Sequence, residues 1–292
     1  MKRIHDVACI VVTFNRLPLL KKCLNSIRNQ TNKDFDIIVV NNGSTDGTKE
    51  WLDGQENLIV INQSNVGGAG GFFSGMKKAY EDGYEWVWMM DDDGIADSSQ
   101  LEALKGGAYK FNSLFLNALV CNIADHDNLA FGLSHDRKII KSTKEAQKYE
   151  VISGAINPFN GTFVNRRVIE TIGYIKKEMF IWGDEREYEL RAKSAGYKIY
   201  TVTNAIHFHP RGKVQKKNVI PFFPKIQIFV PSNERMRVCY RNDGFIYKTY
   251  MPLIEQMKIK ILYSTYYLSR LNFVGLFKYH MYYHRGANNC FE

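Results

Sequence analysis

Short apolar runs alternate with helix-like segments over the first ninety residues. The runs at residues 6–14, 35–40, 58–61 and 86–90 are mostly apolar, and the first three are rich in β-branched residues. Such runs are typical of strands buried on both faces. Apolar residues between the first two runs recur at helical spacing within residues 18–29. The alternation predicts an α/β fold with a mostly parallel sheet covered by helices.

Polar residues follow each of the four predicted strands. They are Thr13 to Arg16, Asn41 to Asp46, Asn65 to Gly71, and Asp91 to Asp93. The carboxyl ends of parallel strands meet at one edge of a sheet, and ligands bind there. The four segments therefore predict one shared crevice.

Asp91, Asp92 and Asp93 follow directly on the fourth apolar run. Three adjacent carboxylates cannot be buried unpaired, so they must lie where the strand emerges. One interpretation is a solvated acidic loop. The other is a site for a divalent cation, which prefers oxygen ligands.

The glycine-rich segment at residues 65–71 follows the third strand and lacks the spacing of a dinucleotide-binding or Walker motif. Its backbone amides lie near a predicted helix start, where an anion or sugar could approach closely. The alternative is a flexible turn.

The chain beyond the acid triplet is less regular. Residues 98–112 predict a helix and 114–121 a strand, whereas the polar residues 122–150 predict an irregular excursion. Residues 154–165 predict a strand broken at Pro158, and a short helix at 166–172 follows.

A helix start is predicted at Asp184, because Glu187 follows at capping-box spacing. Capping leaves Glu185 unexplained, beside Trp182. A carboxylate in a first helical turn is kept ionised, as a general base must be. Asp184 and Glu185 are thus candidates for a catalytic pair, with helix capping as the alternative.

His207 and His209 follow a predicted strand at 197–203 and are two residues apart, so they point to the same side of an extended segment. A structural role and a metal-ligand role both fit them.

Basic residues concentrate near the C-terminus. The formal net charge of the chain is +9. Residues 201–292 contain 14 Lys and Arg against 4 Asp and Glu, so the excess of positive charge in this region is larger than that of the whole chain. Residues 251–285 mix aromatic, aliphatic and basic residues, as helices at a membrane surface do. An ordinary helical subdomain or an interface between copies of the chain is the alternative. Nucleic acid is not expected as a partner, because no known reader motif is present.

The five cysteines are scattered without paired spacing, which indicates a reducing compartment rather than a disulfide framework or zinc site. The N-terminal apolar run is too short for a signal peptide, and no run is long enough to span a membrane. We therefore expect a cytoplasmic protein that is peripheral on the membrane.

Several pieces in this order resemble family 2 of the inverting, nucleotide-sugar-dependent glycosyltransferases, in its galactofuranosyl- and rhamnosyltransferase-like branch. They are VVTFNR (11–16), VVNNGSTDGT (39–48), NVGGAGGF (65–72), MDDDG (90–94), WGDEREYELR (182–191) and the histidine at 207 or 209. The resemblance implies a GT-A fold at residues 1–225, with a donor half to about 120 and an acceptor half beyond it. Residues 226–292 would form a helical region at the membrane or in an oligomer.

The resemblance also implies roles. Donor-binding residues would be Thr13, Arg16, Asn41, Asn42, Asp46, Asn65, Gly68, Asp91 and Asp92. Mn or Mg would be held by Asp91, Asp93 and His209, with His207 as the alternative. Trp182 and Glu187 would bind the acceptor, and Asp184 or Glu185 would be the base. Glu185 is favoured because Asp184 is the better helix cap.

The implied reaction is metal-dependent inverting transfer of a sugar to a lipid-linked or cell-surface glycan, such as an O-antigen or capsule. The first donor expected is UDP-galactofuranose, because NVGGAGGF and WGDE look more like galactofuranosyltransferases. The alternatives are a rhamnosyltransferase using dTDP-rhamnose and a glycan- or nucleotide-binding module without catalysis. Two departures from the family bear on this, since many relatives have aspartate in place of Asn41 and close ones often have aspartate in place of Glu185.

Overall fold

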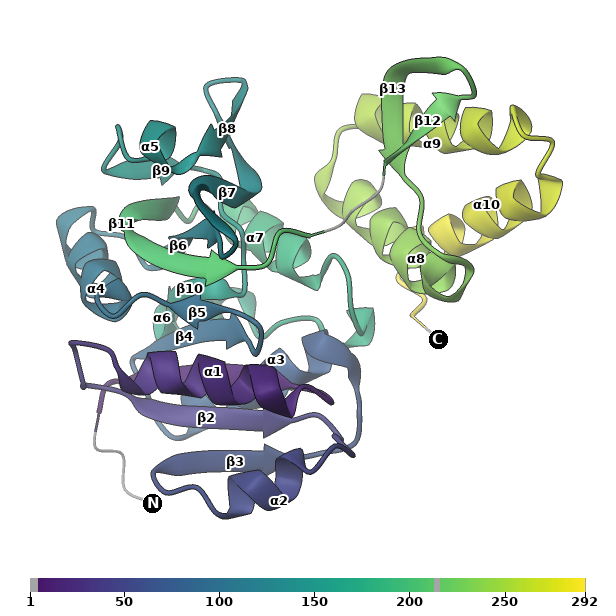
Figure 1. Ribbon diagram of the computed structural model, residues 1–292. Helices are drawn as coiled ribbons and strands as arrows, with labels where there is room; N and C mark the ends of the chain where they lie inside the picture. The colour runs from purple at the N-terminus through teal and green to yellow at the C-terminus, as the bar shows by residue number, and fades with distance from the viewer. Residues whose placement is uncertain (1–4, 213–215, 292) are drawn as a thin grey trace. The chain divides into compact units, whose positions relative to one another are not determined.

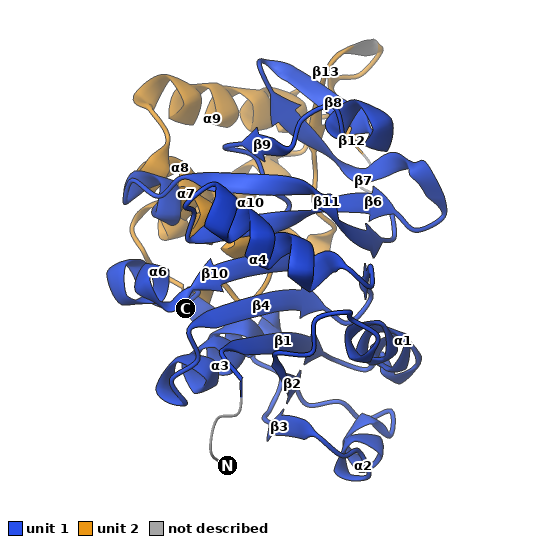
Figure 2. Cartoon of the chain, turned by 90° about the vertical axis from the view of Figure 1, so that its left-hand side faces the viewer, with its two compact units in different colours: residues 1–177, 191–212 blue, residues 178–190, 213–292 orange. Residues whose placement is uncertain are grey.

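The computed structural model describes residues 5–212 and 216–291. They form two compact units, coloured in Figure 2. The first unit contains the residues up to Lys177 together with Arg191–Gly212. The second contains Glu178–Leu190 and the chain from Lys216 onward.

The first unit is built on a sheet whose N-terminal half is parallel (Figure 1). Its strands run in the order β3-β2-β1-β4. They are β1 (Val7–Thr13), β2 (Asp36–Asn41), β3 (Leu58–Asn62) and β4 (Trp86–Asp91). In register, Thr13 pairs with Asn41, and Val12 with Asp91. The polar strand ends therefore lie along one edge, as the sequence predicts.

Helices connect these strands, and glycines allow one of them to approach closely. They are α1 (Leu17–Arg28), α2 (Thr48–Asp53) and α3 (Gly67–Glu81). A Cβ at Gly71 would lie 2.4 Å from the Val12 side chain, and one at Gly75 would lie 2.5 Å from Ile10. Part of the glycine-rich segment thus serves the packing of α3 on β1.

The other half of the sheet has mixed pairing. Strand β10 (Asn160–Asn165) lies antiparallel between β4 and β6 (Phe115–Asn122), and β11 (Ile199–His209) is parallel to β6. Strands β5 (Ile95–Ala96) and β9 (Val151–Ser153) pair with β11. Helices α4 (Gln100–Lys110) and α6 (Arg166–Ile172) complete this half. The predicted α/β class with a mostly parallel sheet is confirmed.

Residues 122–150 are regular, so the prediction of an irregular excursion is wrong. They form β7 (Asp125–His135), β8 (Lys138–Ser142) and α5 (Thr143–Ala146), with β7 and β8 antiparallel. Few apolar residues mark this hairpin, but Leu129, Leu133 and Ile140 are buried in a common core. Because these strands carry few inward-facing apolar residues, the alternation of apolar and polar positions that marks a strand is not apparent in the sequence.

The second unit is mainly helical. Its elements are β12 (Lys216–Ile220), β13 (Phe223–Phe229), α8 (Asn233–Tyr250), α9 (Leu253–Leu268) and α10 (Phe273–Ala287). Tyrosines dominate its core, where Tyr240 and Tyr267 share a 2.7 Å hydrogen bond. In the described residues, no helix is both long and apolar enough to cross a bilayer.

The division between the units passes through α7 (Asp184–Ser194) and just after the start of the short 3₁₀ helix η1 (Lys177–Met179). The Trp182–Glu187 segment therefore belongs to the helical unit. The sequence-based boundary at 225/226 stays a prediction about independently folding domains.

Candidate active site

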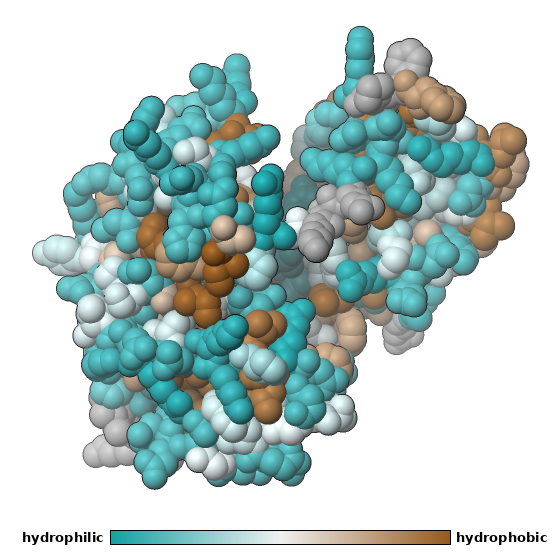
Figure 3. All heavy atoms as spheres, in the orientation of Figure 1, coloured by the Kyte–Doolittle hydropathy of each residue, from teal (hydrophilic) through white to brown (hydrophobic). Residues whose placement is uncertain are grey.

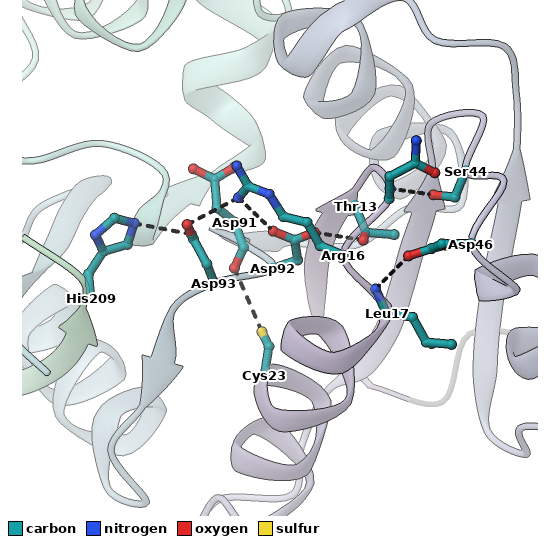
Figure 4. A network of polar contacts seen from close by, with 11 residues as sticks. Thr13, Arg16, Leu17, Cys23, Ser44, Asp46, Asp91, Asp92, Asp93 and His209 are labelled. Carbon is teal, nitrogen blue, oxygen red and sulfur yellow. Dashed lines mark hydrogen bonds and ion pairs between the residues drawn. The ribbon is translucent and has the colours of Figure 1, made fainter. Parts of the chain in front are cut away.

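The acid triplet forms the centre of a charged network at the strand-end edge (Figure 4). Thr13, at the end of β1, donates a 2.6 Å hydrogen bond from Oγ1 to Asp92. Arg16 reaches both neighbouring acids, with Nη1 at 3.2 Å from Asp92 and 3.0 Å from Asp93. The structure thus brings together four residues predicted to bind the donor diphosphate or metal.

His209 joins this network from the end of β11. Its Nε2 lies 3.1 Å from Asp93 Oδ1, and its Nδ1 lies 2.7 Å from the carbonyl oxygen of Pro210. A carbonyl can only accept, so Nδ1 carries a hydrogen. Nε2 then bonds to the carboxylate only if the imidazole is protonated, and otherwise presents a lone pair.

The electrostatics of the network agree with this arrangement. Burial opposes ionisation of Asp93, but His209 and Arg16 outweigh it and lower the pKa of Asp93. Burial also opposes charge on His209, while the bond and charge of Asp93 raise its pKa. For Asp92, burial raises the pKa more than Thr13 and Arg16 lower it. Asp92 is buried, and Asp93 holds the more stable negative charge.

His207, the alternative metal ligand, is enclosed in the same unit. It is completely buried, and Gln100 lies 3.2 Å from its Nδ1. Its Nε2 has no hydrogen-bond partner within the described residues and faces Gly94, where a Cβ would lie only 2.1 Å away. Burial lowers the pKa of His207 to about 3. Of the two histidines, His209 is the one in contact with the triplet.

The donor set at this edge suits a hard or borderline divalent cation. Carboxylate oxygens with one imidazole fit Mn²⁺, and Mg²⁺ is held by one or two carboxylates. The Pro210 carbonyl fixes the His209 tautomer with Nε2 toward Asp93, as second partners of metal-binding histidines do. Among the described residues, however, no group of three acids, histidines or cysteines is arranged to hold a metal ion, and Asp93 is paired with Arg16.

Two further predicted donor-binding residues, Asn41 and Asn42, lie along the same edge and hold its loops. Buried Asn41 donates to Asn62 and accepts from the Ser44 amide. Buried Asn42 ties β2 to the start of α3 by donating to the Gly67 carbonyl at 2.9 Å. These asparagines hold the loops at the strand-end edge through their hydrogen bonds.

Asp46, Asn65 and Gly68 lie at helix starts. Asp46 accepts from the Leu17 amide at the start of α1 and from Thr48 at the start of α2. Its pKa is lowered, because these bonds outweigh the opposing effect of burial. Asn65 accepts from the Gly67 amide at 2.9 Å. A Cβ at Gly68 would meet open space, so its packing does not require glycine.

The predicted catalytic pair begins α7 in the helical unit. Asp184 is 4% exposed, whereas Glu185 is half-buried and accepts a 3.1 Å hydrogen bond from the Gly183 amide. The helix starts at Asp184 itself, one residue earlier than an Asp184 cap would place it. Glu187 is 2% exposed, and its carboxylate accepts a 2.6 Å hydrogen bond from the Tyr250 hydroxyl.

Trp182 is half-buried and already stacked. Its ring lies 5.2 Å from that of Phe229 with an angle of 7° between the planes, and the Arg235 guanidinium lies 5.5 Å from its centroid. The backbone here is unusual, with φ of +66° at Phe180 and +68° at Trp182. Each bulky residue in this region costs roughly 1–3 kcal/mol and persists only where its surroundings impose it.

Sequence reasoning missed the residues that support these groups. Gln100 bonds to Trp88 and faces His207, while Asn242 and Tyr250 bond to the Trp182–Glu187 segment. Their contacts span up to 107 positions in sequence, so local patterns carry no signal for them. Only Gly94, directly after the triplet, offered a signal in the sequence, because a glycine there is consistent with another side chain approaching the backbone closely.

Comparison with known proteins decides the family. The model of the family described as "Glycosyl transferase family 2" matches residues 8–173, which is more than half of the chain. The chain belongs to glycosyl transferase family 2. It is a glycosyltransferase, as the sequence predicts.

Two similar proteins are "Galactofuranosyltransferase GlfT1" of Mycolicibacterium smegmatis and of Mycobacterium tuberculosis H37Rv. The first is 29% identical over 256 residues, covering 84% of each chain. The second is 33% identical over 252 residues, covering 83% of this family 2 chain and 82% of the relative.

Solved structures share the fold at low identity. Residues 1–349 of TarS from S. aureus in complex with UDP match with a TM-score of 0.54 and 13% identity, covering 97% of this chain and 91% of that one. GalNAc-T7 with UDP, GalNAc and Mn²⁺ matches with a TM-score of 0.56 and 15% identity, covering 87% and 54%. These likenesses confirm a GT-A-type glycosyltransferase fold.

Proposed function

We propose that this enzyme transfers galactofuranose from UDP-galactofuranose to a lipid-linked or cell-surface glycan, with inversion. The observation that carries the proposal is its similarity to the two galactofuranosyltransferases over more than four-fifths of both chains. The donor's nucleotide is supported by the UDP in the TarS structure.

In this proposal Asp91, Asp93 and His209 hold Mn²⁺ or Mg²⁺. A cation held there would supply charge neutralisation for the leaving diphosphate. Arg16 pairs with Asp93 in this structure, and its guanidinium would pair with a phosphate oxygen when Asp93 serves the cation. Asp92 stays between Thr13 and Arg16 and fixes the donor side of the site.

Glu185 is the proposed general base. It removes the proton of the acceptor hydroxyl as that oxygen bonds to the anomeric carbon and the bond from that carbon to the diphosphate breaks. Its exposure favours it over Asp184, which is nearly buried. One Glu185 oxygen is fixed by the Gly183 amide. Trp182 and Glu187 would then shape the acceptor side, Glu187 through Tyr250 because its carboxylate is buried.

Nucleotide release decides the donor. The protein is incubated with Mn²⁺, a glycan acceptor and either UDP-galactofuranose or dTDP-rhamnose, with Glu185→Gln as the inactive control. Acceptor-dependent release of UDP is expected. Release of dTDP instead indicates a rhamnosyltransferase, and no release from either donor with any acceptor supports a binding module.

We also propose that α9 and α10 attach the enzyme to an anionic membrane surface. Large apolar side chains on these helices and on the turn between them are 49–77% exposed, an arrangement that marks interaction surfaces. They are Leu253, Ile254, Met257, Ile261, Leu268, Leu271, Phe273, Val274 and Phe277. Exposed Lys258, Lys260 and Lys278 lie among them in sequence, which suits anionic lipid. Figure 3 shows apolar residues at the outer edge of the helical unit.

Flotation with vesicles tests this attachment. Phe273→Glu combined with Phe277→Glu should abolish flotation with anionic vesicles, while Ile139→Glu, at a 58% exposed site on β8, should leave it intact. Unchanged flotation of the double variant would contradict this assignment. If the double variant instead lost a concentration-dependent dimer that the wild type forms, these helices would be an interface between copies of the chain.

A further inference from the structure

The backbone just before the catalytic pair is held in an unusual course. Phe180, Trp182 and Gly183 all have positive φ, at +66°, +68° and +90°. Only the glycine adopts such values easily. A left-handed course at two aromatic residues persists only if other groups impose it. Those groups lie on α8 of the same unit.

Asn242 is the main such group. It is 1% exposed, and its amide nitrogen lies 2.9, 3.0 and 2.7 Å from the carbonyl oxygens of Met179, Ile181 and Trp182. Its amide oxygen accepts from the Arg241 guanidinium, at 3.1 Å from Nε. Because carbonyls only accept, this orientation of the amide is fixed by its partners.

Arg241 adds a second set of donors. It is 5% exposed and donates to the carbonyls of Met179 at 3.0 Å and Phe291 at 2.8 Å. Burial lowers its pKa, with a further effect of Arg237 and Arg285. A buried guanidinium is costly unless its N–H groups are hydrogen-bonded, and the Met179 carbonyl of this segment is one of the groups that satisfy it.

The helix carrying these residues is itself fixed against α10. A Cβ at Gly244 would lie 2.0 Å from the Tyr283 carbonyl oxygen, and one at Gly286 would lie 1.6 Å from the Arg241 carbonyl oxygen. Only glycine permits this close approach of the two helices. The close packing of α8 against α10 therefore holds the helix that carries Asn242 and Arg241 in place.

We propose that Asn242 and Arg241 are positioning residues that set the course of Phe180–Gly183 and thereby aim Trp182 and Glu185 at the acceptor. Both side chains act on backbone carbonyls and neither touches the acid pair in the contacts described. The inference rests on the proposed function for its catalytic consequence. Its structural part, control of the Trp182 conformation, stands apart from it.

Asn242→Asp tests the proposal, because it keeps the shape and removes both donor hydrogens. Asn288→Asp is the matched control, since Asn288 donates to the His284 carbonyl at the end of α10 and not to this segment. We expect kcat to fall about 10- to 100-fold, as for a displacement near 1 Å, while the Kd for UDP with Mn²⁺ stays within about twofold. Arg241→Lys, which keeps the charge, should show a smaller loss of the same kind.

Trp182 emission gives a readout independent of turnover. Asn242→Asp should change the emission spectrum, and the change should vanish when Trp182→Phe is added. An unchanged spectrum, a wild-type kcat in both α8 variants, or a loss of kcat matched by an equal loss of UDP binding would overturn the proposal. If the wild type itself released no UDP, the proposed function would fail, and the emission test would still decide the positioning.

Discussion

The triplet edge and the Trp182–Glu187 segment are held in opposite ways. At the triplet edge, charged side chains hold one another, as Arg16 and His209 hold Asp93. In the helical unit, buried amide and guanidinium groups of α8 hold backbone carbonyls. A mutually paired network can exchange partners when a charged ligand arrives, whereas a clamped backbone keeps its course. The difference suits a site for an anionic donor and a site for a neutral hydroxyl.

The largest effect is expected from Asp93→Asn. This change removes the carboxylate shared by His209 and Arg16 and one proposed metal ligand. Loss of several kcal/mol of charge stabilisation corresponds to a fall in turnover of roughly 1,000-fold. UDP release under saturating donor measures it, with Asp127→Asn on the exposed β7 hairpin as the control. Turnover within tenfold of wild type would contradict the proposed role of Asp93 as a metal ligand.

Arg16→Ala should weaken donor binding more than turnover. A charge-assisted bond to a phosphate is worth about 1.5–3 kcal/mol, or roughly a tenfold to hundredfold rise in the Kd for UDP. Calorimetry measures it. Arg28→Ala, at the other end of α1 and bonded to Gln55, is the matched control and should bind normally. Equal effects of both changes would show that overall charge, not the triplet edge, binds the donor.

Tyr250→Phe tests the other side of the comparison. It leaves buried Glu187 without the hydroxyl that donates to it at 2.6 Å. Such a bond to a charged group is worth roughly 1.5–3 kcal/mol, and the free energy of unfolding should fall by about this amount while UDP binding is unchanged. Denaturant titration measures it against Tyr109→Phe, at a 92% exposed site. A stability equal to that control would mean that Glu187 gains little from Tyr250.

The smallest effect is expected from Asp243→Asn on α8. Burial raises the pKa of Asp243 to about 6, against the opposing charge of Arg186. Between the ordinary value of 3.8 and about 6 the folded state binds more protons than the unfolded chain, so stability falls as the pH rises through this window. Removing the carboxyl group should stabilise the protein by about 1–2 kcal/mol above pH 6. The full difference between the two pKa values sets an upper limit of roughly 3 kcal/mol for this stabilisation.

The measurement is the free energy of unfolding of both proteins at several pH values. The stabilisation should disappear at the acid end of the window, where the carboxyl group is protonated in both states. A difference that stays constant with pH would show that Asp243 does not titrate in this window.

The triplet edge could be predicted from sequence because its chemistry is local. Thr13, Arg16 and Asp91–Asp93 each follow an apolar strand, and parallel pairing must bring such ends together. His209 is named from the sequence ahead of His207, but the burial of His207 against Gly94 could not be predicted, because it depends on the pairing of β11 with β5.

The support of the acceptor-side segment could not be predicted. Asn242 bonds to a carbonyl 60 residues earlier, and such backbone contacts leave no trace in local composition. The apolar and basic pattern predicted the helices of the C-terminal region, but not that the Trp182–Glu187 segment belongs to the same compact unit.

The most direct test of the central claim measures UDP binding in the presence of Mn²⁺ by calorimetry for Asp93→Asn and Glu185→Gln, alongside their turnover. We expect both variants to lose turnover, Asp93→Asn also to lose metal-dependent UDP binding, and Glu185→Gln to bind UDP as the wild type does. Wild-type UDP binding by Asp93→Asn, or undiminished turnover by Glu185→Gln, would contradict the division of donor and base chemistry between the triplet edge and the Trp182–Glu187 segment.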